Sequence, residues 1–285
     1  MAQTILVTGS TSGFGRLTVE TLARQGHTVF AGMRGIANKN AQVASELQTL
    51  AESEHLPLHI VEIDVNDDAS ILHAIDSIVD RASRLDVVVN NAGITYTGPI
   101  ESFTLEQVQR QFDTNVFGVI RVNRAALPHM RAQGSGLLLQ VGSVVGRIAF
   151  PFVGLYGATK FAIEGLTESY RYELAPLGID AVVVEPGTYP TNLSANRLEP
   201  ADAERVAPYA AAMTDFVPRF MAEIMSSTPP NPQEVADAIA ELIALPAGKR
   251  PLRTVVAPAS QRQAPQEINA AAERATRGYM EMLSQ

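Results

Sequence analysis

Short apolar runs alternate with amphipathic segments along most of the chain. The apolar runs carry few charges and occupy residues 4–7, 28–33, 58–63, 85–89, 137–141, 179–184 and 253–257. Runs of this kind are typical of strands that are buried on both faces of a parallel sheet. Between them, helical spacing covers residues 38–53, 67–84, 104–132, 155–174 and 232–245. This alternation predicts an α/β fold with a doubly wound parallel sheet of about seven strands and helices on both faces.

Two segments depart from this alternation. Residues 188–230 mix charged side chains with apolar ones, namely Tyr189, Leu193, Leu198, Tyr209, Met213, Phe216, Phe220, Met221 and Met225. Four of them, from Tyr209 to Phe220, fall on one helical face, which fits either a packing stripe or the wall of an apolar pocket. Residues 262–285 read as a helix with Ile268, Ala271, Ala275, Tyr279 and Leu283 on its apolar side. That helix could pack on its own subunit, cover a pocket or reach a neighbour.

No linker interrupts the chain, so residues 1–285 are predicted to form a single domain. The net charge of −8 makes a nucleic-acid or anionic-membrane surface an unlikely partner. The absence of cysteine excludes disulfides, thiolate catalysis and cysteine-ligated zinc, and no metal site is predicted. No stretch approaches the ~20 apolar residues of a membrane span. The first strand starts too close to Met1 to leave room for a signal peptide, which predicts a cytoplasmic protein.

A glycine-rich loop follows the first apolar run. It reads Thr8-Gly9-Ser10-Thr11-Ser12-Gly13-Phe14-Gly15 and is followed by a helical stripe that begins at Leu17. Glycine between a strand and a helix permits a tight turn and a close approach of the backbone to a pyrophosphate. The start of the helix offers free N–H groups and a positive dipole end. An ordinary βα turn would also contain glycine, but the flanking strand and helix favour phosphate binding.

Further polar or turn-forming residues follow other predicted strands. They are Asp64, the Asn90–Gly93 segment, Ser143 and the pair Pro186-Gly187. Individually, each has a simpler interpretation as a helix cap, a turn or a strand terminator. Together with the glycine loop they gather at the C-terminal edge of the sheet, where open α/β sheets bind their ligands.

Tyr156 and Lys160 lie four residues apart in a predicted helix, and therefore share one face of it. A free tyrosine has a pKa of about 10 and is a poor proton acceptor at neutral pH. A nearby ammonium favours the phenolate, so we expect Lys160 to lower the pKa of Tyr156. The pair could then act as a proton donor and acceptor near neutral pH. Alone, the same spacing would also suit an amphipathic surface helix.

Taken together, these motifs resemble the short-chain dehydrogenase/reductase family, whose single-domain branch has a Rossmann-like fold. The resemblance is close over residues 3–191 and looser over residues 230–258. It implies catalytic roles for Asn115, Ser143, Tyr156 and Lys160. The cofactor-binding residues that it implies are Gly9, Ser10, Ser12, Gly13, Phe14, Gly15, Arg34, Asp64, Val65, Asn91, Ala92, Gly93, Tyr156, Lys160, Pro186, Gly187 and Thr191.

The resemblance implies hydride transfer between a nicotinamide ring and a carbonyl or alcohol carbon. Tyr156 would exchange the proton with the substrate oxygen, and Lys160 would tune Tyr156 and bind the nicotinamide ribose. Ser143 would polarise the substrate oxygen, and Asn115 would hold a water that links Lys160 to solvent. In this family, residues 188–230 would form a lid over the substrate. Helices around 104–132 and 155–174 would form the interface of a homodimer, with a tetramer as the alternative.

The end of the second strand bears on the choice of cofactor. An NAD enzyme usually has an acid there to accept the ribose 2′-hydroxyl, whereas this chain has Met33 followed by Arg34. Arg34 could pair with a 2′-phosphate, with Lys39 or Asn40 as an added contact. We therefore expect NADP(H), while NAD(H) stays possible because Ser12 stands where NADP-dependent relatives often carry a base.

The residues favour a carbonyl reductase or alcohol dehydrogenase that acts on a bulky apolar substrate. Phe150, Pro151 and Phe152 precede Tyr156 and could line its pocket. Ketone, steroid-like, retinoid-like and acyl substrates all remain open. A dinucleotide-binding sensor or scaffold without turnover is the main alternative, although such proteins typically lack the tyrosine or lysine. The epimerase and dehydratase branch is disfavoured, because its glycine spacing differs and its substrates need a larger C-terminal domain.

Overall fold

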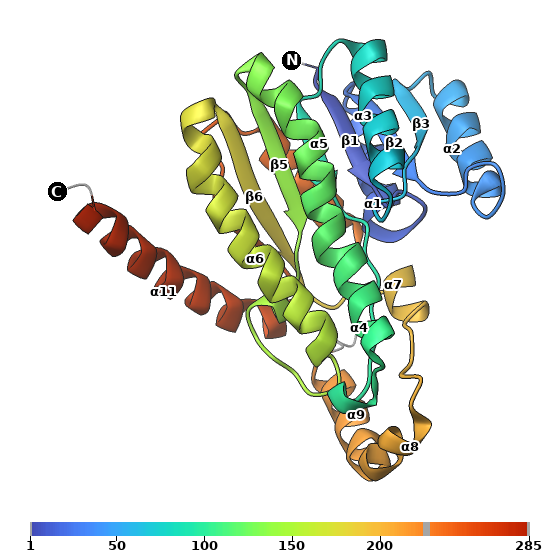
Figure 1. Ribbon diagram of the computed structural model, residues 1–285, viewed down its shortest axis with the longest axis vertical. Helices are drawn as coiled ribbons and strands as arrows, with labels where there is room; N and C mark the ends of the chain where they lie inside the picture. The colour runs from blue at the N-terminus through green and yellow to red at the C-terminus, as the bar shows by residue number, and fades with distance from the viewer. Residues whose placement is uncertain (1, 225–228, 284–285) are drawn as a thin grey trace.

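The computed structural model describes residues 2–224 and 229–283. Within them the strands form one sheet of seven parallel strands, in the order β3-β2-β1-β4-β5-β6-β7 (Figure 1). The strands are β1 (Thr4–Thr8), β2 (Thr28–Met33), β3 (Leu58–Glu62), β4 (Val87–Asn90), β5 (Gly136–Val141), β6 (Ile179–Pro186) and β7 (Arg253–Val256). The order reverses between β1 and β4, which is the topological switch point where such sheets bind ligands. The predicted doubly wound fold is confirmed.

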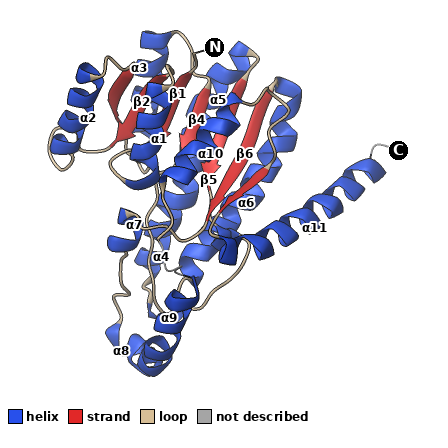
Figure 2. Cartoon of the chain, turned by 180° about the vertical axis from the view of Figure 1, so that it is seen from behind, coloured by secondary structure: helices blue, strands red, loops and turns tan. Residues whose placement is uncertain are grey.

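Helices cover both faces of the sheet. One face carries α1 (Gly13–Arg24), α2 (Ala41–Ser53) and α10 (Gln233–Ala244), and the other carries α3 (Asp68–Ala82), α5 (Gly118–Gln133) and α6 (Gly154–Leu174). Figure 1 shows α5 and α6 in front of the sheet, and Figure 2 shows α1 and α10 from behind. Each face has its own apolar core cluster, and neighbouring residues of a strand alternate between the two, as Ile5 and Leu6 of β1 do.

The predicted helix over residues 104–132 is divided in the structure. It consists of α4 (Leu105–Phe112), a π-helical turn (Asp113–Phe117) and α5. Thr104 and Gln107 form a capping box at the start of α4, which satisfies backbone donors that a helix start leaves free. A π-helical turn shifts the register of the side chains that follow, and such turns are frequent at functional sites. This one contains Asn115.

A helical segment lies below the C-terminal edge of the sheet (Figures 1 and 2). It contains α7 (Asn192–Ala195), α8 (Ala203–Val206) and α9 (Ala210–Ile224). We call residues 188–224 the lid. Of its predicted apolar residues, Met225 lies outside the described residues, and only the backbone of Phe220 and Met221 is described. Short 3-10 turns occupy Ile100–Ser102, Val144–Gly146, Ala175–Leu177 and Ala207–Tyr209.

The C-terminal extension forms one long helix, α11 (Ala259–Leu283). It starts beside the end of β7 and extends away from the body of the protein (Figures 1 and 2). Asn269 donates to the buried Glu185 carboxylate at 2.7 Å, and Thr276 donates to Glu168 at 3.0 Å, so α11 packs on its own subunit. Among the described helices, none is both long enough and apolar enough to cross a membrane.

Candidate active site

A large open cavity lies at the C-terminal edge of the sheet, with a volume of about 2110 Å³. Its lining comes from the glycine loop, the ends of β2, β4, β5 and β6, the lid and the first turns of α11. The polar strand-end residues that the sequence placed at one edge therefore share one space. The first turns of α11 cover part of this cavity, through Ser260, Gln261, Ala264 and Pro265.

The glycine loop is shaped by close backbone contacts. Gly9 and Gly13 have φ angles of +69° and +55°, which glycine adopts readily. A Cβ on Gly15 would lie only 2.4 Å from both Asn91 Nδ2 and the Gly9 carbonyl oxygen. Asn91 occupies that space and donates to the Thr8 and Gly9 carbonyl oxygens at 2.9 and 3.0 Å. The Asn90–Gly93 segment therefore holds the loop in place from the neighbouring strand.

The start of α1 fits a phosphate group. Ser12 caps the helix without a side-chain hydrogen bond, so the first N–H groups of α1 have no partner from that side chain. The Cβ that Gly13 lacks would fill the space toward Thr191 of the lid, 3.4 Å away. Ser12, Gly13, Phe14 and Thr191 all line the cavity. These features make a cradle between loop and lid that suits a dinucleotide pyrophosphate.

Three of the predicted site residues do not line the cavity, namely Ser10, Gly15 and Asn115. Ser10 is fully buried, and its hydroxyl donates to the Val7 carbonyl at 2.7 Å, so it stabilises the turn. Gly15 serves the close approach to Asn91. Thr11, which the sequence analysis did not name as a site residue, does line the cavity.

The end of the cavity next to the C-terminal ends of β2 and β3 is lined by Met33, Arg34, Lys39, Asn40 and Asp64. Arg34 lies 3.6 Å from the Asp64 carboxylate in a half-exposed ion pair. The Glu62 carboxylate accepts from the backbone amides of Gly35 and Ile36 at 2.5 and 2.8 Å. Because those amides are occupied, an anionic group at this end would rely on side chains, with Arg34 and Lys39 as the cations present.

Lys160 is buried beneath Tyr156 on α6. Its Nζ donates to the Val141 carbonyl at the end of β5 at 2.7 Å, and lies 5.5 Å from the centre of the Tyr156 ring. An ammonium has three N–H donors, so this bond leaves two for other partners. Burial lowers the pKa of Lys160 to about 8, and the Glu164 carboxylate one turn further along α6 acts in the opposite direction.

The pKa of Tyr156 departs from the sequence-based expectation. Burial raises the pKa of Tyr156 well above its usual value, and a hydrogen bond with Ser143 offsets this only in part. The expected lowering of the Tyr156 pKa is therefore not found in the protein alone. The physical reason is that burial disfavours a phenolate strongly, while the Lys160 ammonium is directed at a backbone carbonyl and is itself more easily deprotonated.

Ser143 is held at the end of β5 with its hydroxyl at the cavity wall. The hydroxyl donates to the Pro186 carbonyl and accepts from the Val145 amide, both at 3.3 Å. Both bonds are long, so the hydroxyl can exchange them for a ligand oxygen at little cost. Ser143 is thus a neutral donor fixed near Tyr156.

Asn115 lies behind these residues, not among the cavity-lining ones. Its side chain donates to the Ile94 carbonyl at 2.9 Å and to Thr159 Oγ1 at 3.1 Å, and accepts from the Ile94 amide at 2.9 Å. Asn115 therefore joins the π-helical turn to the segment after β4 and to α6, which carries Tyr156 and Lys160. Its role in a water relay stays a prediction.

The cavity wall formed by the lid and by the segment before Tyr156 is largely apolar; we call it the lid wall. Phe150, Pro151, Phe152, Leu193, Leu198, Met213 and Phe216 line it. The rings of Phe152 and Phe216 meet edge to face, with centroids 5.8 Å apart, which joins α9 to the segment before Tyr156. Tyr209 does not line the cavity, because its hydroxyl donates to Glu101 at 2.6 Å on the outer surface. Among the stripe residues whose side chains the structure describes, Met213 and Phe216 therefore serve as pocket wall and Tyr209 does not.

Comparison with known proteins identifies the family to which the chain belongs. The sequence profile of the short chain dehydrogenase family matches residues 3–202. The chain belongs to the short-chain dehydrogenase family. An uncharacterized oxidoreductase of Bacillus subtilis is 35% identical to this short-chain dehydrogenase over 83% of both chains. A 3-ketodihydrosphingosine reductase of Bacteroides thetaiotaomicron is 31% identical and covers 91% of this chain and 89% of its own.

Retinol dehydrogenase 8 of Bos taurus is 32% identical, over 88% of this short-chain dehydrogenase and 80% of its own length. Among solved structures, a short-chain dehydrogenase of Streptomyces avermitilis is 30% identical with a TM-score of 0.73, covering 100% of this chain and 97% of its own. A gluconate 5-dehydrogenase of Burkholderia cenocepacia, solved with NADP and tartrate, is 25% identical, also with a TM-score of 0.73, over 90% and 93% of the two chains.

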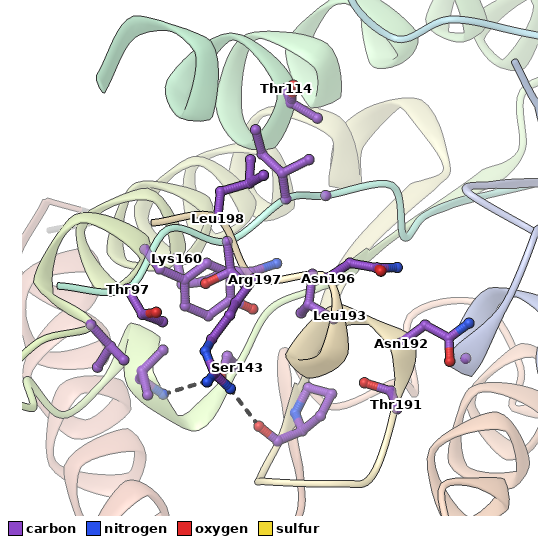
Figure 3. Close-up of a pocket in the computed structure, with 18 of the residues that line it drawn as sticks. Thr97, Thr114, Ser143, Lys160, Thr191, Asn192, Leu193, Asn196, Arg197 and Leu198 are labelled. Carbon is purple, nitrogen blue, oxygen red and sulfur yellow. Dashed lines mark hydrogen bonds between the residues drawn. The ribbon is translucent and has the colours of Figure 1, made fainter. Parts of the chain in front are cut away.

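The sequence argument missed several residues of this short-chain dehydrogenase that line the cavity. They are Thr97, Arg110, Thr114, Asn192, Asn196 and Arg197 (Figure 3 labels all but Arg110). Asn192 follows the predicted Thr191 directly and could have been named with it. The others carry no motif, because they come from the loop after β4, helix α4, the π-helical turn and the lid, whose placement depends on tertiary packing.

Proposed function

We propose that the protein is an NADP(H)-dependent oxidoreductase that interconverts a carbonyl group and a secondary alcohol. The observation that carries the proposal is the convergence of Tyr156, Lys160 and Ser143 in the same cavity as the glycine loop. One end of that cavity suits a dinucleotide, and the other offers one acid/base group, one cation and one neutral donor. A site that only bound a dinucleotide would not need all three.

In the proposed reaction, the dinucleotide handles the hydride and side chains of this protein handle the proton. A nicotinamide dinucleotide supplies or accepts the hydride when it is bound. In reduction, the Tyr156 phenol donates its proton to the oxygen of the carbonyl as negative charge develops there. The raised pKa of Tyr156 keeps that proton in place at neutral pH until negative charge develops on the substrate oxygen. Ser143 polarises the same oxygen, and the Lys160 ammonium stabilises the phenolate that proton donation leaves behind.

Arg34 and Lys39 support a preference for NADP(H). They are the cations at the end of the cavity beyond Met33, and they lie where a 2′-phosphate would come if the pyrophosphate sat on α1. The gluconate dehydrogenase at 25% identity was solved with NADP, as was a serine dehydrogenase at 26% identity, solved with NADP+. NAD(H) remains the alternative cofactor.

The apolar lid wall supports a bulky apolar ketone or aldehyde as the substrate. Phe150, Phe152 and Phe216 offer aromatic surface beside the reacting groups. Two relatives bear names that refer to retinol and to 3-ketodihydrosphingosine, an alcohol and a ketone. These relatives support the class of reaction, and this chain's own substrate is to be found by assay.

Turnover of NADPH tests this proposal. The purified protein is assayed for NADPH and NADH oxidation against a panel of ketones, aldehydes and diketones, beside Tyr156→Phe. We expect NADPH-dependent reduction whose rate falls by about 100- to 10,000-fold in Tyr156→Phe, the usual contribution of a general acid. Unchanged NADPH binding in that variant would assign the loss to proton transfer. Tight NADPH binding with no turnover across the panel would instead favour the dinucleotide-binding scaffold.

A further inference from the structure

Arg197 is an arginine of the lid that lines the same cavity as Tyr156, Lys160 and Ser143. Within residues 2–224 and 229–283, its guanidinium has no hydrogen bond and no ion pair. Most other arginines of the lid and the sheet edge have carboxylate partners, as Arg205 has in Asp202 and Glu101. A guanidinium that faces a cavity without such a partner is free to bind a ligand.

The backbone beside Arg197 is fixed to the body of the protein. Leu198 donates to the Thr95 carbonyl at 2.9 Å and accepts from the Thr97 amide at 3.1 Å, forming a short parallel bridge to the segment after β4. This bridge determines where the lid enters the cavity. Figure 3 shows the Arg197 side chain extending into the pocket, in front of Ser143 in that view.

Arg197 lines the same cavity as Ser143 and Tyr156. In the view of Figure 3, Thr191 and Asn192 lie apart from Arg197, and Thr191 is the lid residue that approaches Gly13 of the phosphate loop. The dinucleotide end has its own cations in Arg34 and Lys39. A phosphate of the cofactor is therefore not needed to account for Arg197.

Charge and polarity around Arg197 point to an anion. Five cationic side chains and two carboxylates line the cavity, although the chain as a whole has a net charge of −8. The cations are Arg34, Lys39, Arg110, Lys160 and Arg197, and the carboxylates are Asp64 and Glu199. A cavity of one sign concentrates ligands of the other. Arg197 is exposed at the cavity wall, so its guanidinium can reach a charged group of a ligand without first being buried.

We propose that Arg197 binds a carboxylate of the substrate, so that the substrate is an apolar ketone or aldehyde that also carries a carboxylate. The planar guanidinium can donate two parallel hydrogen bonds to the two carboxylate oxygens. The apolar body of the substrate packs against Phe152 and Phe216, while its carbonyl oxygen meets Ser143 and Tyr156. This inference rests on the proposed function for the carbonyl, but the binding of a carboxylate at Arg197 can be tested without turnover.

The binding test uses phenylbutanoate and phenylbutanamide, which share an apolar body and differ in charge. Calorimetry measures both on the full-length protein, saturated with NADP+. A hydrogen-bonded charge is worth roughly 1.5–3 kcal/mol, so we expect the acid to bind about 10- to 150-fold more tightly than the amide. Arg197→Met keeps the length of the side chain and is expected to bring this ratio close to one. Arg205→Met removes a lid arginine that does not line the cavity, and is expected to keep the ratio.

Three results would overturn the inference. The wild-type protein could bind the acid and the amide equally. Arg197→Met could weaken both probes to the same extent, which would make Arg197 a packing residue. Arg197→Met could also weaken NADP+ itself while leaving the acid-to-amide ratio unchanged, which would assign Arg197 to the cofactor.

A turnover test separates this inference from the proposed function. It compares kcat/KM for benzoylpropanoate and its methyl ester with NADPH, in the wild type, Arg197→Met and Tyr156→Phe. We expect the acid to be preferred, and the preference to be lost in Arg197→Met. Tyr156-dependent reduction of both substrates without a preference for the acid would refute the inference alone. Selective acid binding without Tyr156-dependent turnover would refute the proposed function and leave the carboxylate site in place.

Discussion

At the scale of single residues, burial of Tyr156 and Lys160 pushes both side chains toward their neutral forms. A phenol with a raised pKa stays protonated at neutral pH but gives up its proton less readily, and an ammonium with a pKa near 8 is charged at neutral pH but close to losing its charge. At neutral pH the pair therefore holds a proton on Tyr156 and a charge on Lys160, which are the forms that the proposed carbonyl reduction uses. Alcohol oxidation requires the Tyr156 phenolate, which burial disfavours.

The pH dependence of reduction follows from the lowered pKa of Lys160. The ammonium is fully present below a pH of about 8 and is lost as the pH rises through that value, while Tyr156 keeps its proton. We therefore expect kcat for reduction to be level below pH 8 and to fall above it. Oxidation is expected to show the opposite trend and to rise with pH. A reduction rate that increases through this range would contradict the assignment of charge to Lys160.

Arg34 provides a residue-scale test of cofactor choice. If it pairs with a 2′-phosphate, Arg34→Ala loses a charge-assisted hydrogen bond of roughly 1.5–3 kcal/mol, and the Kd for NADPH rises about 10- to 150-fold. The Kd for NADH is expected to change little, because NADH lacks that phosphate. The half-exposed position of Arg34 favours the lower part of this range.

The matched control for Arg34 is Arg24→Ala. Arg24 is also half-exposed and ion-paired, through Glu54, but lies at the end of α1 and does not line the cavity. Its loss is expected to leave both dissociation constants unchanged. Equal weakening of NADPH and NADH in Arg34→Ala would argue against a 2′-phosphate contact.

At the scale of elements, the site depends on the contact between the glycine loop and the end of β4. Gly15→Ala would place a methyl group 2.4 Å from Asn91 Nδ2 and the Gly9 carbonyl, so loop and strand must separate. Overpacking of this kind costs about 1–3 kcal/mol, and we expect a lower Tm together with a loss of dinucleotide binding. Gly278→Ala on α11 meets nothing within 4 Å, so it is expected to leave dinucleotide binding unchanged and, because alanine favours a helix, not to lower Tm. Normal dinucleotide binding by Gly15→Ala would show that the loop does not need this contact.

Much of the fold could be predicted from the sequence, because a parallel sheet buries whole strands and leaves plain apolar runs. The strand-end residues followed from the same logic, since parallel strands bring their C-terminal ends to one edge. The π-helical turn around Asn115 could not be predicted, because helical periodicity continues through Asp113–Phe117. The inward direction of Ser10 and the pocket positions of Arg110 and Arg197 depend on packing between distant segments, which periodicity does not report.

At the scale of the whole molecule, the cavity draws on both ends of the chain, from Gly9 to Pro265. The lid and α11 therefore line one part of the cavity, and the loops after the first strands line the end proposed for the dinucleotide. Outside the cavity, exposed apolar side chains lie on the α4–α6 face, including Leu105, Phe117, Phe161 and Tyr172. This is the face that the sequence analysis proposed as a homodimer interface.

Sedimentation analysis tests that interface. We expect a homodimer, because exposed apolar groups on adjacent helices gain from mutual burial. Phe117→Glu and Phe161→Glu are each expected to shift the protein toward the monomer, since a carboxylate would be buried without a partner. Leu72→Glu changes an exposed apolar residue on α3 and is expected to leave the dimer intact. Dissociation by Leu72→Glu alone would place the interface on α3 instead.

The central claim is that this cavity brings a hydride and the Tyr156 proton to the same carbonyl group. Its most direct test is mass spectrometry of the alcohol formed with NADPH that carries deuterium at the transferring position of the nicotinamide. The account predicts one deuterium at the carbinol carbon in the wild-type product, and a rate of product formation about 100- to 10,000-fold lower in Tyr156→Phe that still binds NADPH. An unlabelled alcohol, or labelled alcohol formed equally well by Tyr156→Phe, would contradict the account.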